Sequence, residues 1–282
     1  TGRRSDGALL AGFIAGLGTL CRPILLPTTL AGWVWLMYAS RPNRQTLVTT
    51  LRRQMTGSMV FIGGCGIVLL PWVVRNTLVM GAPIMTTSHG GYTLMLGHNA
   101  AYSAEVVHGP SGAVWSHASL TAWQKEVDSQ LLNQGIQPHE ELRRDRAMSK
   151  MAWATISSDP VEAVRSAGTL LSRLWSLAPL STAERPVPRS VRSLIALFNG
   201  ALFLLAAAGL LGLFRSDLRL AGLLSTPVLV FTVMHSLYWA DQRMRAPLVP
   251  ALALLAAWSL STVYGRLWRN VTRNADVSDG AG

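Results

Sequence analysis

The sequence predicts a mainly α-helical protein that crosses a membrane about six times. A helical extracytoplasmic domain is predicted between spans three and four. Half of the 282 residues are hydrophobic and only 14% are charged, which is typical of membrane proteins. Several apolar runs approach the roughly 20 residues that a spanning helix needs, and the polar stretch 77–190 separates them into two groups.

The individual spans follow from the lengths of the apolar runs. The opening run, 7–39, is too long for one helix and is interrupted by Arg22 and Pro23, so we interpret it as a hairpin of two helices, 7–21 and 24–39. A re-entrant segment is the alternative for the first helix, which is short. The other four predicted spans are 57–74, 193–214, 218–240 and 246–264.

The first helix of this hairpin carries Gly12 and Gly16, four residues apart on one face. Small residues at this spacing allow two helices to approach closely inside a membrane. We therefore expect this face to pack against a neighbouring helix.

The arginines predict the orientation of the chain. With six spans, three arginines fall in the short loops on one side: Arg22, Arg243 and Arg245. Eleven fall on the opposite side: Arg3, Arg4, Arg41, Arg44, Arg52, Arg53, Arg215, Arg219, Arg266, Arg269 and Arg273. The positive-inside rule then puts both termini in the cytoplasm, and we expect a multi-pass protein of the bacterial inner membrane.

Four regions result from this topology. Residues 1–76 form an N-terminal membrane region of three spans, and 77–190 form the extracytoplasmic helical domain. Residues 191–265 form a C-terminal membrane region of three spans, and 266–282 form a cytoplasmic tail.

Composition and spacing argue against several other classes. The net charge of +11 is scattered between apolar runs instead of covering one soluble face, which argues against nucleic acid as a partner. Cys21 and Cys65 lie in or beside apolar segments and offer neither a disulfide framework nor a metal spacing. His89 and His98 have no third ligand nearby, and no nucleotide-binding motif is present, so we expect no metal and no cofactor.

Three helices are predicted in the polar stretch, and the first two show an apolar stripe. Residues 119–133 place Leu120, Trp123, Val127 and Leu131 on one face, and Gly135 stops the helix. Pro138 is expected to start the second helix, with Glu140 and Glu141 in its first turn. The stripe of this second helix is Leu142, Met148, Met151, Ala152 and Thr155.

The third helix has a predicted N-terminal cap at Asp159, followed by Pro160 and Glu162. Its basic residues Arg165 and Arg173 lie opposite an apolar face. That face comprises Val161, Val164, Leu171, Leu174 and Trp175. Two interpretations remain open: the helix lies along the membrane surface, or it packs on its own domain.

Three arginines are candidates for a phosphate site. Arg22 lies at the outer mouth of the first hairpin, and Arg243 and Arg245 lie at the outer mouth of the last. Guanidinium groups bind phosphate through paired hydrogen bonds, so we expect them to hold the phosphate of a lipid carrier. The alternative is that they extend to lipid headgroups and do nothing more.

The carboxylate nearest to these arginines is Asp241. Close arginines lower the pKa of a carboxylate, so we expect Asp241 to be an ion-pair partner and not a base.

A second group of polar residues follows the third span. Arg75 and Asn76 close that span, and a glycine-punctuated stretch contains His89, His98 and Asn99. Its glycines allow close backbone approach to a ligand. We expect these five side chains to face substrate hydroxyls or headgroup oxygens.

These segments together resemble the pattern of polytopic glycosyltransferases of the GT-C fold. The closest are bacterial relatives of the dolichyl-phosphate-mannose protein mannosyltransferases. The matching residues are Arg22-Pro23, the run from Pro71 to Asn76, Gly81, Pro83, the stretch from Ser88 to Asn99, and Arg243-Met244-Arg245-Ala246-Pro247-Leu248-Val249-Pro250. Met244 stands where these relatives usually have tyrosine, so one hydroxyl of the pattern is missing.

The resemblance implies transfer of a sugar from a polyprenyl-phosphate donor to a glycan, lipid or protein acceptor on the outer face. Its catalytic acidic residue is expected in the first outer loop of a full-length enzyme. Nothing in this sequence matches that loop, so we expect the chain to be a C-terminal portion without a catalytic residue of its own. The alternatives are a transporter or flippase for a lipid-linked or anionic substrate, and a non-catalytic membrane scaffold.

Overall fold

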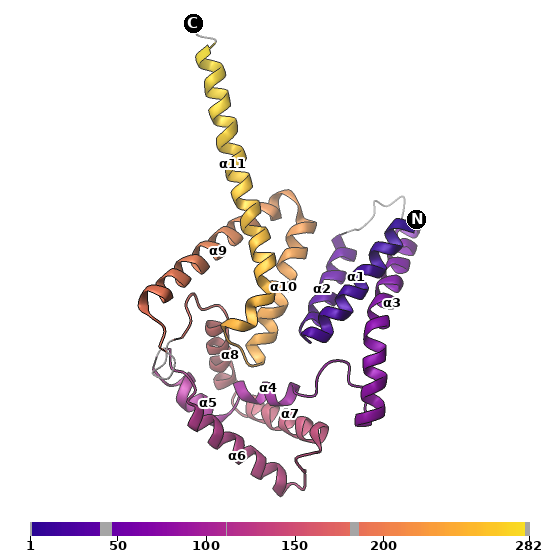
Figure 1. The fold of residues 1–282 in the computed structure, drawn as a ribbon, viewed down its shortest axis with the longest axis vertical. Helices are drawn as coiled ribbons and strands as arrows, with labels where there is room; N and C mark the ends of the chain where they lie inside the picture. The colour runs from indigo at the N-terminus through magenta and orange to yellow at the C-terminus, as the bar shows by residue number, and fades with distance from the viewer. Residues whose placement is uncertain (1, 40–46, 111, 181–185, 280–282) are drawn as a thin grey trace.

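The computed structural model describes residues 2–39, 47–110, 112–180 and 186–279, and these are mainly helical, with no strand among them. Figure 1 shows two groups of long helices, with a layer of shorter helices at one end. The predicted fold class, a mainly α polytopic protein, is confirmed.

The first group consists of α1 (Gly2–Cys21), α2 (Leu25–Ala39) and α3 (Leu47–Met80). A side chain at Gly12 would collide with the backbone carbonyl of Phe61, and one at Gly64 would collide with that of Leu9. Gly16 is also tightly packed, against Val68. The close packing predicted for Gly12 and Gly16 is confirmed, and the partner is α3.

Helix α3 runs further than the sequence predicts. It continues through Pro71 to Met80, where we expected the membrane region to end at Asn76. Proline removes one hydrogen bond of the helix without ending it here, and neighbouring polar groups in membrane helices commonly compensate. The helix ends at Gly81, whose φ of 70° is a backbone conformation that suits glycine.

The second group consists of α9 (Arg189–Ser216), α10 (Leu218–Leu237) and α11 (Val249–Asp279). Gly209 of α9 lies directly against the Leu255 carbonyl of α11. Gly222 of α10 receives the ring of Trp35, which joins this group to α2. The predicted tail 266–282 is helical to residue 279 as part of α11, and its last three residues lie outside the described ranges.

Four described segments are long and apolar enough to cross a membrane: Gln54–Met80, Arg189–Ser216, Leu218–Leu237 and Gln242–Gly265. Asp6–Cys21 and Leu25–Ala39 are apolar but shorter, so the count of six spans stays a prediction. The start of α1, the described end of α11 and the α9–α10 turn lie toward one end of the molecule, and the polar layer lies at the other (Figure 1). Which end faces the cytoplasm also stays a prediction.

The polar layer contains α4 (Gly90–Gly97), α5 (Ala100–Tyr102), a π-helical turn (Ser103–Val107), α6 (His117–Asn133), α7 (Glu141–Ser158) and α8 (Pro160–Leu174). They share one core, in which Trp123, Val127 and Leu131 of α6 are buried as predicted. We call this layer the polar domain.

Helix α7 begins at Glu141, not at Pro138 as predicted. The Glu140 carboxylate accepts a hydrogen bond from the backbone N–H of Gln137, and the Glu140 N–H donates to the Gln137 carbonyl. These bonds form a turn over 137–140 in place of the first helical turn.

Helix α8 begins as predicted, with the Asp159 side chain accepting a hydrogen bond from the Glu162 N–H at 2.9 Å. Its buried residues are Ser166, Leu170 and Leu174, and it packs on α10. The helix therefore packs on its own molecule through this face. Val161 and Val164, which we assigned to the apolar face, are instead exposed.

Candidate functional site

The connection between α10 and α11 joins the membrane helices to the polar domain. The Trp239 N–H donates to the Thr93 carbonyl at 3.1 Å, and His98 Nε2 donates to the Leu237 carbonyl at 3.0 Å. Because these bonds reach the middle of α4 and the residue that caps its C-terminus, residues that follow in the chain are held at the boundary between the two regions.

Those residues form the 3₁₀ helix η3 (Gln242–Leu248), whose second residue is the exposed Arg243. The Arg243 side chain is 85% exposed and its NH2 group lies 2.8 Å from Asp241 Oδ2. The ion pair predicted for Asp241 is present. Burial tends to raise the pKa of Asp241, but the hydrogen bonds from Arg243 outweigh it and hold that pKa below its ordinary value.

Arg245, two residues later, is buried inside the molecule. Its NH1 group donates to the carbonyls of Leu174 and Ser176, at 2.9 and 2.5 Å, just where α8 ends. Its guanidinium carbon lies 5.1 Å from the centre of the Phe203 ring of α9. A cation at a helix C-terminus satisfies the last carbonyls, so Arg245 fastens η3 to α8 and α9.

The expectation that Arg243 and Arg245 hold the same phosphate is not met, because the structure does not bring their guanidinium groups together. A 3₁₀ helix has three residues per turn, so side chains two positions apart point in different directions. Here one points to solvent and the other into the protein.

Arg22 lies in the turn between α1 and α2, between the two helices of the predicted hairpin, and is exposed. The buried His235, near the end of α10, interacts electrostatically with both Arg22 and Asp241. This common neighbour places Arg22 in the same region as the Asp241–Arg243 pair. We call Arg22, Asp241 and Arg243 the arginine site.

Arg75 and Asn76 lie elsewhere, on the last turns of α3. Arg75 is exposed, and its NH1 group donates to Asn76 Oδ1 at 3.0 Å. Asn76 is only 2% exposed, and its amide donates to the Ile84 carbonyl at 3.1 Å. The structure thus places Asn76 as a residue that shapes the chain leaving α3.

His98 and Asn99 are also buried. The Asn99 side chain caps α5 by accepting from the Tyr102 N–H at 2.8 Å, and it donates to the Met95 carbonyl. Burial lowers the pKa of His98, and the hydrogen bond to Leu237 opposes this only in part. His98 is therefore neutral at pH 7, and both side chains serve the packing of α4 and α5.

His89 is exposed and lies at a cavity of about 410 Å³ between α4, α6 and α7. We call it the α4–α7 pocket. Its polar rim includes Ser88, His89, Asp128, Glu141, Arg144 and Asp145. The sequence analysis missed this pocket; its only local signal is that Glu141 and Asp145 are four residues apart and share a helix face.

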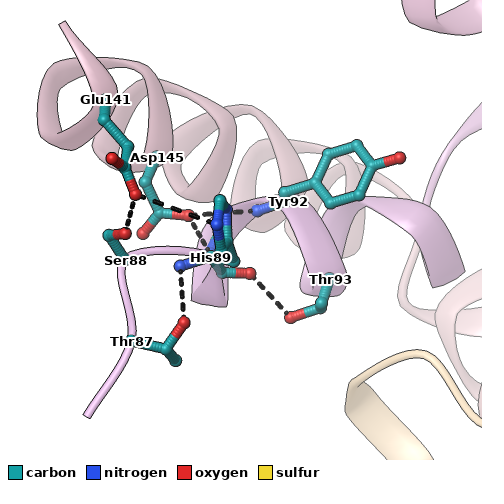
Figure 2. Close-up of polar contacts among 8 residues, drawn as sticks. Thr87, Ser88, His89, Tyr92, Thr93, Glu141 and Asp145 are labelled. Carbon is teal, nitrogen blue, oxygen red and sulfur yellow. Dashed lines mark hydrogen bonds and ion pairs between the residues drawn. The ribbon is translucent and has the colours of Figure 1, made fainter.

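Figure 2 shows how the two carboxylates of α7 meet the start of α4. Glu141 accepts a hydrogen bond from the Ser88 hydroxyl and lies 3.8 Å from His89 Nε2. Asp145 accepts from the backbone N–H groups of Gly91 and Tyr92, at 2.7 and 3.3 Å. Within the described ranges, no group of three or more His, Cys, Asp or Glu side chains is arranged to hold a metal ion.

No protein-family model matches the chain, and neither the curated proteins nor the solved structures include a match to it. The residues and their geometry are therefore the basis for assigning a function.

Proposed function

We propose that this chain is the C-terminal part of a membrane glycosyltransferase. It uses a polyprenyl-phosphate-linked sugar donor and an acceptor on the outer face of the membrane. One observation carries the proposal: Arg243 is exposed at the boundary between the membrane helices and the polar domain, with Arg22 in the same region. The resemblance of the surrounding sequence supports the identification of the donor.

The chemistry of the arginine site suits a lipid phosphate. A guanidinium group is always charged and can bind two phosphate oxygens in parallel. Arg22 and Arg243 lie at the ends of apolar segments, so a phosphate bound there leaves its polyprenyl tail beside the hydrophobic surface of the helices. Both groups act near a medium of low dielectric constant, where charge–charge interactions are stronger than in water.

Asp241 and Arg245 have supporting roles in this proposal. The Asp241 carboxylate stays ionised and holds Arg243 when no phosphate is present, which makes it a poor proton acceptor. Arg245 is a positioning residue, because its buried hydrogen bonds hold η3 and hence Arg243 in place. No residue of this chain is assigned as the catalytic acid or base.

Sugar transfer by the full-length enzyme tests the proposal. In proteoliposomes with a radiolabelled polyprenyl-phosphate sugar, Arg243→Ala should lower the transfer rate by about 10- to 100-fold, the effect of one charged hydrogen bond of roughly 1.5–3 kcal/mol. Arg22→Ala should lower the rate in the same direction. Arg146→Ala, an exposed arginine of α7 outside the arginine site, is the matched control and should keep full activity.

Full transfer by both Arg22→Ala and Arg243→Ala would contradict the assignment of these residues. Movement of the lipid-linked donor across the bilayer without sugar transfer would instead identify a transporter.

A further inference from the structure

The α4–α7 pocket has the size of a small-molecule site. Its volume of about 410 Å³ lies within the range of roughly 300–1,000 Å³ that is usual for such sites. None of the elements that carry Arg22, Arg243 and Arg245 contributes to it. The pocket is therefore separate from the arginine site, and binding of the donor phosphate does not explain its presence.

The floor of the pocket is apolar and partly aromatic. Trp123, Val127 and Met148 are buried core residues that line it, and the half-buried Tyr92 lies beside them. The rings of Tyr92 and Trp123 have centroids 6.1 Å apart and are tilted by 36°. Rings of this kind provide a rigid apolar surface with a polar group at the edge, which suits the C–H face of a sugar ring.

The rim offers hydrogen-bond acceptors that are only half used. The bonds of Glu141 involve Oε1 and those of Asp145 involve Oδ1. Among the described residues no further hydrogen bond is made by Glu141 Oε2 or Asp145 Oδ2. An ionised carboxylate only accepts, so a ligand that binds to these atoms must donate.

The rim also contains donors. Arg144 pairs with Asp128 and lines the pocket, and the Tyr92 hydroxyl accepts from Gln124 at 2.7 Å, which leaves its own proton to donate. A ligand that binds to groups that only donate, such as the guanidinium of Arg144, must accept. A ligand that uses both sets of groups must therefore both donate and accept.

The charges of the rim restrict the chemical class of the ligand further. Three carboxylates, Asp128, Glu141 and Asp145, face one guanidinium, Arg144, so phosphate and other anions are repelled. An ammonium group donates but cannot accept, so on its own it would leave the donors Arg144 and Tyr92 without an acceptor. Hydroxyl groups do both without charge.

We infer that the α4–α7 pocket binds a neutral, hydroxyl-rich ligand, a saccharide unit, through the ring surface of Tyr92 and Trp123 and the free oxygens of Glu141 and Asp145. Its role as the place where a glycan acceptor docks rests on the proposed function. Saccharide binding itself does not, because it requires neither the donor nor the transfer reaction.

Binding by the purified chain in detergent tests the inference. Saturation-transfer NMR with the neutral methyl glycosides of glucose, mannose and galactose should show binding of at least one. Glucuronate, which carries a negative charge, should bind more weakly than that glycoside because the rim repels anions. Glu141→Gln should weaken its binding by about tenfold, because one charged hydrogen bond is lost.

Two controls keep the result interpretable. Glu126→Gln makes the same chemical change on the exposed face of α6, outside the pocket, and should leave binding unchanged. Tyr92→Phe keeps the ring and should lose about fivefold in affinity, as expected for one neutral hydrogen bond of roughly 1 kcal/mol. The thermal unfolding of each variant shows whether its fold is intact.

Failure of all three neutral glycosides to bind would overturn the inference, as would equal binding by Glu141→Gln and the parent chain. Binding of methylammonium, a cation without hydroxyl groups, as tightly as the neutral glycosides would identify a cation site and would also overturn it. Arg243→Ala separates the two proposals, since it should keep saccharide binding even where polyprenyl-phosphate binding is lost.

Discussion

The arginine site and the α4–α7 pocket lie on the same half of the molecule and have opposite electrostatic character. The arginine site presents Arg22 and Arg243 to solvent beside apolar helices. The pocket presents three carboxylates around an apolar floor inside the polar domain. The net charge of +11 therefore does not predict which ligand either site favours, because each site attracts or repels ligands through its own nearby charges.

The two regions also differ in how they are held in place. The arginine site depends on a short connection that Arg245 fastens to α8 and α9. The pocket depends on the direct contact of α4 with α7 at Gly91. Each attachment can be broken separately.

The largest expected effect is on the attachment of the arginine site. Arg245→Met leaves the buried Leu174 carbonyl without its donor, leaves the Ser176 carbonyl with Gln242 alone, and removes the cation over the Phe203 ring. These losses should lower the free energy of unfolding by about 2–4 kcal/mol. Arg245→Lys should recover part of this, because an ammonium group can still donate. Thermal unfolding in detergent measures the difference.

The matched change on the neighbouring arginine is Arg243→Met. It removes only an exposed ion pair and should alter stability by less than about 1 kcal/mol. Equal destabilisation by Arg243→Met and Arg245→Met would show that the two arginines are not divided between binding and positioning.

The second largest effect on stability is expected at the contact between α4 and α7 that holds the pocket. A methyl group at Gly91 would collide with the Asp145 carbonyl, so Gly91→Ala should push α4 from α7 and lower stability by about 1–3 kcal/mol. Saccharide binding should be lost with it. Gly90→Ala is the control, because a methyl group there meets open space. If both variants unfold at the same temperature, the close contact at Gly91 is not what holds the pocket.

His98 lies where the polar domain meets the end of α10, and its protonation should make the stability of this boundary depend on pH. Because burial lowers the folded-state pKa of His98, its contribution to stability is present above the unfolded value of about 6.5 and is lost as the pH falls below it. The stability difference between the parent chain and His98→Gln should therefore shrink between about pH 7.5 and pH 5. Thermal unfolding across this range measures it, and a difference that stays constant with pH would contradict the assignment.

The smallest expected effect is on Asp241. Asp241→Asn removes the ion pair that competes for Arg243, so binding of a polyprenyl phosphate should tighten by about two- to fivefold, as for a surface salt bridge below 1 kcal/mol. Saccharide binding in the α4–α7 pocket should not change. Weaker phosphate binding would mean that Asp241 positions Arg243 for its ligand instead of competing with it.

The features that the sequence predicted correctly are local ones. The cap at Asp159, the buried stripe with Trp123 and the close packing at Gly12 each depend on a few neighbouring residues and a helical period. The predicted limits of two helices were less accurate. Helix α3 continues past Pro71 to the positive-φ residue Gly81, and α7 begins after Pro138 because Glu140 closes a turn with the Gln137 N–H.

The candidate site was predictable only in part. Arg22, Asp241 and Arg243 were identified from their places between apolar runs. The burial of Arg245 was not, because its carbonyl partners are about seventy residues away in the sequence. The α4–α7 pocket was missed for the same reason: it exists only where three helices from separate parts of the chain meet.

The role of Arg243 is tested most directly by measuring polyprenyl-phosphate binding to this chain with native mass spectrometry. If Arg243 holds the donor phosphate, Arg243→Ala should weaken binding at least about tenfold while Arg146→Ala binds as the parent chain does. Equal binding by all three proteins would contradict the phosphate site and, with it, the proposed function.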